Sequence, residues 1–74
     1  MSYYVRDKRF NEAGRAVFEL YRAMDNGFDH HQATIEVNSE AGNGIKVLLG
    51  SLTPAGKERA WDAIRSYEGV NPHN

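Results

Sequence analysis

The side chains that could do chemistry in this chain are few, and none stands at a catalytic spacing. The densest group of potential metal ligands is Asp29, His30 and His31. Adjacent side chains on an extended segment point to opposite sides, and no further histidine or cysteine stands at a ligand spacing from them. The serines fit turns, caps or exposed positions, so no serine–histidine–aspartate arrangement is indicated. We therefore expect no catalytic residue, no metal site and no cofactor, and a protein that is not an enzyme.

Two glycine-rich segments are candidates for anion binding. The first, 42–44, joins two expected strands, which fits a hairpin turn rather than a phosphate loop. The second, 50–56, leads from a strand into a helix, so its backbone N–H groups, with Ser51 and Thr53, could bind an anion at the helix N-terminus. It lacks the lysine and the glycine spacing of nucleotide-binding loops, and a helix cap alone explains Thr53 and Pro54.

One cluster near the N-terminus combines basic and aromatic side chains, as single-stranded nucleic-acid platforms do. It contains Arg6, Lys8 and Arg9 beside Tyr3 and Tyr4. Nine Lys+Arg against ten Asp+Glu give a formal net charge of −1, so no overall field attracts nucleic acid. Nucleic-acid binding is therefore an alternative hypothesis that depends on this local patch.

Apolar side chains at the margins of the expected elements favour contact with another protein instead. Phe18 and Trp61 lie at the edges of the apolar arcs of two expected helices, and Leu48 falls on an otherwise polar strand face. Aromatic residues are the usual anchors of protein interfaces. The predicted interface residues are Tyr3, Tyr4, Phe18, Leu48 and Trp61.

The first element that must position these residues is a predicted helix over about 8–26. Its apolar residues fall within one arc of a 3.6-residue period, and charged residues three and four apart occupy the other side. Asp7 is the expected N-cap, and Gly27 is the expected residue after the last helical turn. The residues of the apolar arc are Phe10, Ala13, Val17, Leu20, Tyr21 and Met24, and we expect Val17 and Leu20 at the centre of the core.

Alternating apolar residues predict a β-hairpin, 32–38 paired with 45–50. A three-residue loop at 40–42 gives Gly42 a positive φ. It sets Ile35 opposite Val47, Val37 opposite Ile45 and Glu36 opposite Lys46. A shift of two residues, with Asn43 in the left-handed position, keeps the same faces and stays open as an alternative.

A second helix is predicted over about 54–68, with Thr53 as N-cap, Pro54 as first helical residue and Gly69 as its end. A third strand at 2–6 is an option, and 70–74 are expected to form a flexible tail. The predicted fold is α+β: a small antiparallel sheet with both helices on one face, in a single domain over 1–74.

Size and composition predict how the chain is stabilised and where it works. A chain of 74 residues buries only about 60% of the surface of its unfolded state, and this one has no cysteine to add a disulfide. We therefore expect a homodimer. No apolar run is long enough for a membrane span, and the start lacks the apolar core of a secretion signal. A cytoplasmic protein without membrane contact is expected.

In size, absence of cysteine, near-neutral charge and compact α+β order, the chain resembles small accessory proteins of bacteriophages and mobile elements, including anti-CRISPR proteins. The resemblance concerns general character and implies no residue's role. It implies a non-enzymatic protein that inhibits a host defence by occupying the surface of a protein partner, whose identity the sequence does not indicate. The alternatives are a nucleic-acid-binding regulator and a dimer that sequesters a small ligand or nucleotide between its two copies.

Overall fold

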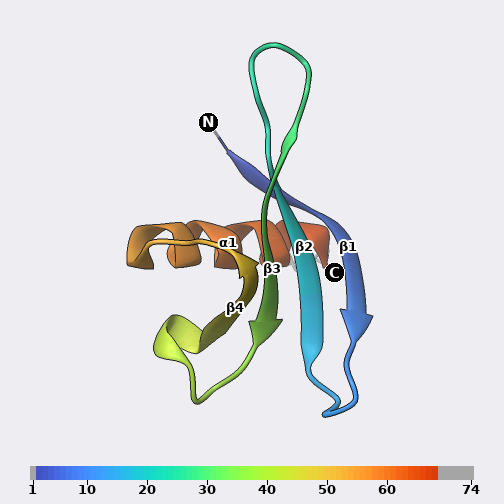
Figure 1. The fold of residues 1–74 in the computed structure, drawn as a ribbon, viewed down its shortest axis with the longest axis vertical. Helices are drawn as coiled ribbons and strands as arrows, with labels where there is room; N and C mark the ends of the chain where they lie inside the picture. The colour runs from blue at the N-terminus through green and yellow to red at the C-terminus, as the bar shows by residue number, and fades with distance from the viewer. Residues whose placement is uncertain (1, 69–74) are drawn as a thin grey trace, which may run out of the picture.

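Four antiparallel strands and one helix make up the computed structural model, which describes residues 2–68 (Figure 1). The strands pair in chain order, β1-β2-β3-β4, and α1 runs across one face of the sheet. The α+β class is confirmed, while Gly69 and the predicted tail 70–74 lie outside the described residues. The elements are β1 (Tyr3–Phe10), β2 (Ala16–Arg22), β3 (His30–Val37), the short 3-10 turn η1 (Gly42–Gly44), β4 (Ile45–Gly50) and α1 (Pro54–Tyr67).

The predicted first helix over 8–26 is wrong, and so is the helix-hairpin-helix arrangement. These residues form the end of β1, a tight turn, all of β2 and the start of the β2–β3 loop. The Asn11 side chain accepts hydrogen bonds from the backbone N–H groups of Ala13 and Arg15, both at 3.0 Å, and Gly14 has a φ of 77°. This is the three-residue hairpin loop that needs a left-handed third residue, and a helix interior would tolerate that glycine poorly.

The apolar residues of this segment fit two periods at once, which explains the wrong prediction. In the structure Ala16, Phe18 and Leu20 alternate along β2 and face α1, whereas Val17 lies on the opposite face of the sheet. Leu20 is in the core as predicted, while Val17 is buried outside it. Asp7 lies in β1 rather than at a helix N-terminus. The glycine expected at the helix end instead has a φ of 84° in the β2–β3 loop.

The remaining strands follow the prediction closely. The optional strand at 2–6 exists and continues to Phe10, and the predicted hairpin is β3 and β4. All three predicted cross-strand pairs, including Glu36 opposite Lys46, are present. The predicted positive φ at Gly42 is wrong, because the loop is longer than three residues and its left-handed positions are Asn43 and Gly44.

The second predicted helix, α1, is confirmed together with its cap. Thr53 Oγ1 accepts the Gly56 N–H at 3.0 Å, and Pro54 starts the helix, where its missing N–H leaves no unpaired donor. One side of α1 packs on the sheet and supplies Ala60, Ala63 and Ile64 to the core. The strand residues of the core are Val5, Phe18, Leu20, Ala33, Ile35 and Ile45.

Each of the three strand pairings contains one extra residue. The pairing shifts at Arg6 in β1, at Gln32 in β3 and at Leu48 in β4. Such β-bulges increase the twist of a sheet and change the face to which the following side chains point. The bulge at Arg6 therefore decides which charged residues of β1 lie on the face away from α1.

Candidate functional site

The face of the sheet opposite α1 gathers aromatic and charged side chains, and no other described element covers it. The bulge at Arg6 brings Tyr4, Arg6, Asp7 and Arg9 to this open face, while Lys8 turns toward Phe18 on the helix side. The predicted basic cluster is thus divided between the two faces. We call the open-face group formed by Tyr4, Arg6, Tyr21 and His31 the aromatic cluster.

The Arg6 side chain is the centre of the aromatic cluster. Its guanidinium carbon lies 4.4 Å from the centre of the Tyr21 ring and 6.0 Å from that of Tyr4, and one guanidinium N–H donates to the Tyr4 hydroxyl at 3.4 Å. The Tyr21 and His31 rings meet edge to face, with centres 5.3 Å apart. Stacking of this kind fixes the plane of a guanidinium and leaves donors directed at solvent.

The aromatic cluster adjoins a hydrogen-bonded carboxylate, Glu19. The carboxylate lies 2.8 Å from Arg9 and 2.8 Å from His31 Nε2, and it accepts the Thr34 hydroxyl at 2.6 Å. Burial alone would raise the pKa of the Glu19 carboxyl, but the three hydrogen bonds outweigh it and hold that pKa below its usual value. The Thr34 hydroxyl donates its proton to Glu19, so His31 Nε2, 3.2 Å from that hydroxyl, is not arranged to take the proton and activate the threonine as a nucleophile.

Further along the open face, Glu36 is almost buried among polar neighbours. Hydrogen bonds from Asn38 and then Asn11 hold the pKa of its carboxyl below the usual range, although burial opposes them. Together with Glu19, this carboxylate balances the arginines of the open face. The face therefore carries both signs of charge in alternation rather than a positive field.

The β2–β3 loop is attached to the aromatic cluster at its base. The Tyr4 hydroxyl donates to the Asp29 carboxylate, and this bond lowers the pKa of Asp29 and raises that of Tyr4. The loop extends beyond the sheet at the top of Figure 1, and its Phe28 side chain is 76% exposed. An exposed aromatic side chain thus lies close in sequence to the residue that anchors the loop.

The predicted interface residues do not lie on one surface. Phe18 is 1% exposed and belongs to the core, so its assignment to a surface is corrected. Tyr3 is half-buried on the helix side, and the Trp61 indole N–H donates to the Asn43 carbonyl at 2.7 Å. Only Tyr4 and Leu48 remain at accessible positions away from α1. Phe18 was predicted to lie at the margin of a helix. The segment forms β2 instead, and Phe18 faces α1 from this strand.

The predicted anion site gains no support from its geometry. The Thr53 hydroxyl is used by the helix cap, and the Ser51 carbonyl accepts a hydrogen bond from Gln32. Within residues 2–68, no group of three or more histidine, cysteine, aspartate or glutamate side chains could hold a metal ion. No helix among these residues is long and apolar enough to cross a membrane.

Sequence reasoning did not predict that Tyr21, His31 and Glu19 lie together on the open face, where they complete the site. Each was assigned to another environment: Tyr21 to the apolar side of a helix, Glu19 to its solvated side and His31 to a loop. A usable signal was the alternation of Val17, Glu19 and Tyr21, which places these three side chains on one face of a strand.

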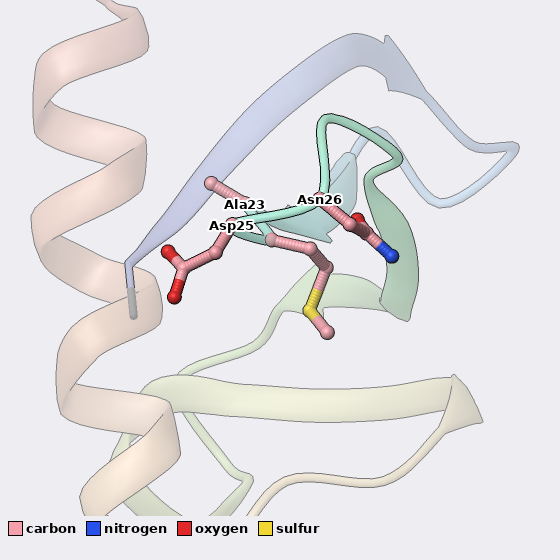
Figure 2. Close-up of a pocket in the computed structure, with 4 residues that line it drawn as sticks. Ala23, Asp25 and Asn26 are labelled. Carbon is pink, nitrogen blue, oxygen red and sulfur yellow. The ribbon is translucent and has the colours of Figure 1, made fainter.

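The hollows of the surface lie elsewhere. One of them, of about 330 Å³, is lined by Ala23, Met24, Asp25 and Asn26 at the start of the β2–β3 loop. Figure 2 shows the Asp25 carboxylate and the Asn26 amide pointing in opposite directions, so they do not converge on a common ligand. Two smaller hollows lie between β1 and α1.

Comparisons with known proteins found no matching family model, no similar curated protein and no similar solved structure.

Proposed function

We propose that this protein is a small non-enzymatic binding protein that contacts a protein partner through the open face of its sheet. The observation that carries the proposal is Arg6 held between Tyr4 and Tyr21 on an uncovered face. Tyrosine and arginine are enriched in the energetically dominant parts of protein interfaces, where a rigid stacked side chain loses little entropy on binding. The exposed Phe28 of the neighbouring loop adds a second aromatic anchor.

The charge of the open face favours protein over nucleic acid. Arg9 is paired with Glu19, and Lys46 lies opposite Glu36, so little net positive charge remains for phosphates. More specifically, we propose that the protein inhibits a host defence in the cytoplasm. This is based on its resemblance in size, charge and α+β order to small accessory proteins of bacteriophages. A nucleotide held between two copies lacks a supporting observation among the described residues.

Single-stranded nucleic acid is the second candidate, because the open face combines aromatic rings, on which bases can stack, with Arg6, which can pair with a phosphate. Fluorescence anisotropy with labelled single-stranded DNA and RNA tests it. Affinity that falls steeply with salt and is lost in Arg6→Glu would favour this candidate over a protein partner.

Quantitative affinity capture from cells that carry the gene tests the primary proposal. Three baits are compared: wild type, Arg6→Glu on the open face, and Arg65→Glu on the exposed side of α1. A partner should be retained by wild type and Arg65→Glu and depleted with Arg6→Glu. Its affinity, then measured with purified proteins, should fall by about tenfold or more in Arg6→Glu.

Equal affinity of all three baits for the purified partner would show that binding uses another surface. Thermal denaturation of both variants separates lost contact from lost folding, since Arg6 is exposed and takes no part in the core.

A further inference from the structure

A groove runs between the edge strand β1 and the exposed side of α1. Two adjoining hollows of about 200 and 190 Å³ share Tyr3, Ala63 and Ser66 in their walls. The helix contributes Arg59, Asp62, Ala63 and Ser66, which share one side of it. Because two of these side chains are small, space remains beside the strand.

The backbone of β1 along this groove has unused hydrogen-bonding groups. Ala23 N–H donates to the Ser2 carbonyl, and Tyr3 pairs with Arg22. Hydrogen-bonded and non-hydrogen-bonded pairs alternate in an antiparallel ladder, so the N–H and C=O groups of Tyr3 and Val5 point away from β2. No described strand lies on that side.

Charge indicates what would fit the groove. Arg59 lines one hollow, and Arg6 follows the edge residues of β1; within residues 2–68 neither forms an ion pair. Asp62, also in the groove, is paired with Arg65 at 3.3 Å. The two arginines would attract carboxylates on an added segment.

The chain's own edge strands do not supply carboxylates in this pattern. β1 itself carries Arg6, Lys8 and Arg9 against Asp7 alone, and the only charged residue of β4 is Lys46. A second copy paired along β1 would therefore bring like charges together, which is unfavourable between adjacent strands.

We propose that the groove between β1 and α1 binds an extended acidic segment of a protein partner, which adds as a fifth strand beside Tyr3–Val5. Alternate side chains of the segment point into the hollows beside Ala63 and Ser66, and the others extend the open face next to Tyr4. The inference rests on the proposed function, because it states how a partner of the open face would also engage the sheet edge.

A displayed library of random peptides, selected on the full chain, supplies the probe. We expect enriched peptides with acidic residues and alternating apolar residues, and we measure their affinity by isothermal titration. Ser66→Trp, which fills both hollows at an exposed position, should weaken binding by about tenfold or more. Arg65→Trp, one residue away and outside the hollows, should leave affinity unchanged.

A second variant tests the strand edge without altering any side chain. Chemical synthesis with an ester in place of the Val5 amide removes one outward N–H and should weaken the same peptides. Peptides without acidic or alternating residues, or affinity unchanged in both Ser66→Trp and the ester protein, would overturn the proposal. So would a dimer that Ser66→Trp dissociates, since the occupant would then be a second copy.

Binding of the complete partner protein to Arg6→Glu, to Ser66→Trp and to the ester protein distinguishes this inference from the proposed function. Binding that is lost in Arg6→Glu but unaffected by Ser66→Trp and by the ester would reject the groove and retain the open face. Binding unaffected by all three changes would reject both.

Discussion

Glu19 links three side chains of the open face, and its ionisation affects the stability of the fold. Because the pKa of its carboxyl is lower in the folded than in the unfolded protein, protonation favours unfolding. The contribution is fully present above the usual glutamate value of about 4.3 and is lost as pH falls through the lower folded value.

We expect the stability difference between wild type and Glu19→Gln to shrink as the pH is lowered from about 5 to about 3. Urea denaturation across this range measures it. Glu12→Gln, at an exposed turn position, is the control. A difference that is constant with pH would mean that the Glu19 carboxylate forms no favourable bonds in solution.

Gly50 has the least room for an added side chain among the glycines of residues 2–68. Its φ is 88°, and an added Cβ would lie 2.4 Å from the Gln32 carbonyl oxygen. We expect Gly50→Ala to lose more than the conformational cost of about 1 kcal/mol, because strands β3 and β4 must separate. Gly27→Ala is the matched control, since its φ is 84° with nothing near the added Cβ. Equal losses in chemical denaturation would argue against the close approach at Gly50.

At the scale of the elements, the cap of α1 is the most local prediction. Thr53→Ala removes the hydroxyl that accepts the Gly56 N–H and should cost about 0.5–2 kcal/mol. Thr53→Ser keeps the acceptor and should cost less. Denaturation midpoints at an unchanged m-value provide the comparison, and equal effects of the two substitutions would assign the loss to the threonine methyl group instead.

Helices and strands that are defined by neighbouring residues, through a cap or an alternating pattern, could be predicted from the sequence. Thr53-Pro54 determines where α1 begins, and the alternation of Ile35 and Val37 determines which face of β3 turns to the core. The tripeptide Glu-Ala-Gly shows the limit of this approach, since it occurs at 12–14 and again at 40–42. Only the first copy closes a three-residue hairpin loop, and there Asn11 accepts two backbone N–H groups.

The candidate site was harder to predict, because its composition depends on a bulge. Without the extra residue at Arg6, strict alternation would not keep Tyr4, Arg6 and Arg9 on one face. No residue type marks that bulge in the sequence. Tyr4 and the two arginines were identified as candidates, whereas Tyr21 and His31 required the strand pairing.

At the scale of the whole molecule, self-association stays a prediction, and the structure reduces the number of surfaces that could form the dimer contact. Phe18 is buried and Trp61 is bonded to Asn43, so the edge strand β4 remains, with Leu48 47% and Leu49 65% exposed. Burying two leucines would supplement the thin core of a 74-residue chain.

We expect sedimentation equilibrium to detect a dimer that Leu49→Glu weakens. Phe28→Glu, an equally drastic change at an exposed loop position, should leave it unchanged. A single monomeric mass for wild type at all concentrations would reject the dimer.

The strand order also bears on how the chain folds in time. Each strand pairs with the next strand in the sequence, so closure of short loops is enough to form the sheet. The helix α1, in contrast, packs against β1 from the other end of the chain. The Lys8–Glu68 pair joins residues sixty positions apart. We therefore expect docking of α1 onto β1 to follow assembly of the sheet, and weakening of this contact to speed unfolding more than it slows folding. The last contact to form would be the first to open, at the same seam between β1 and α1 where the acidic strand is proposed to bind.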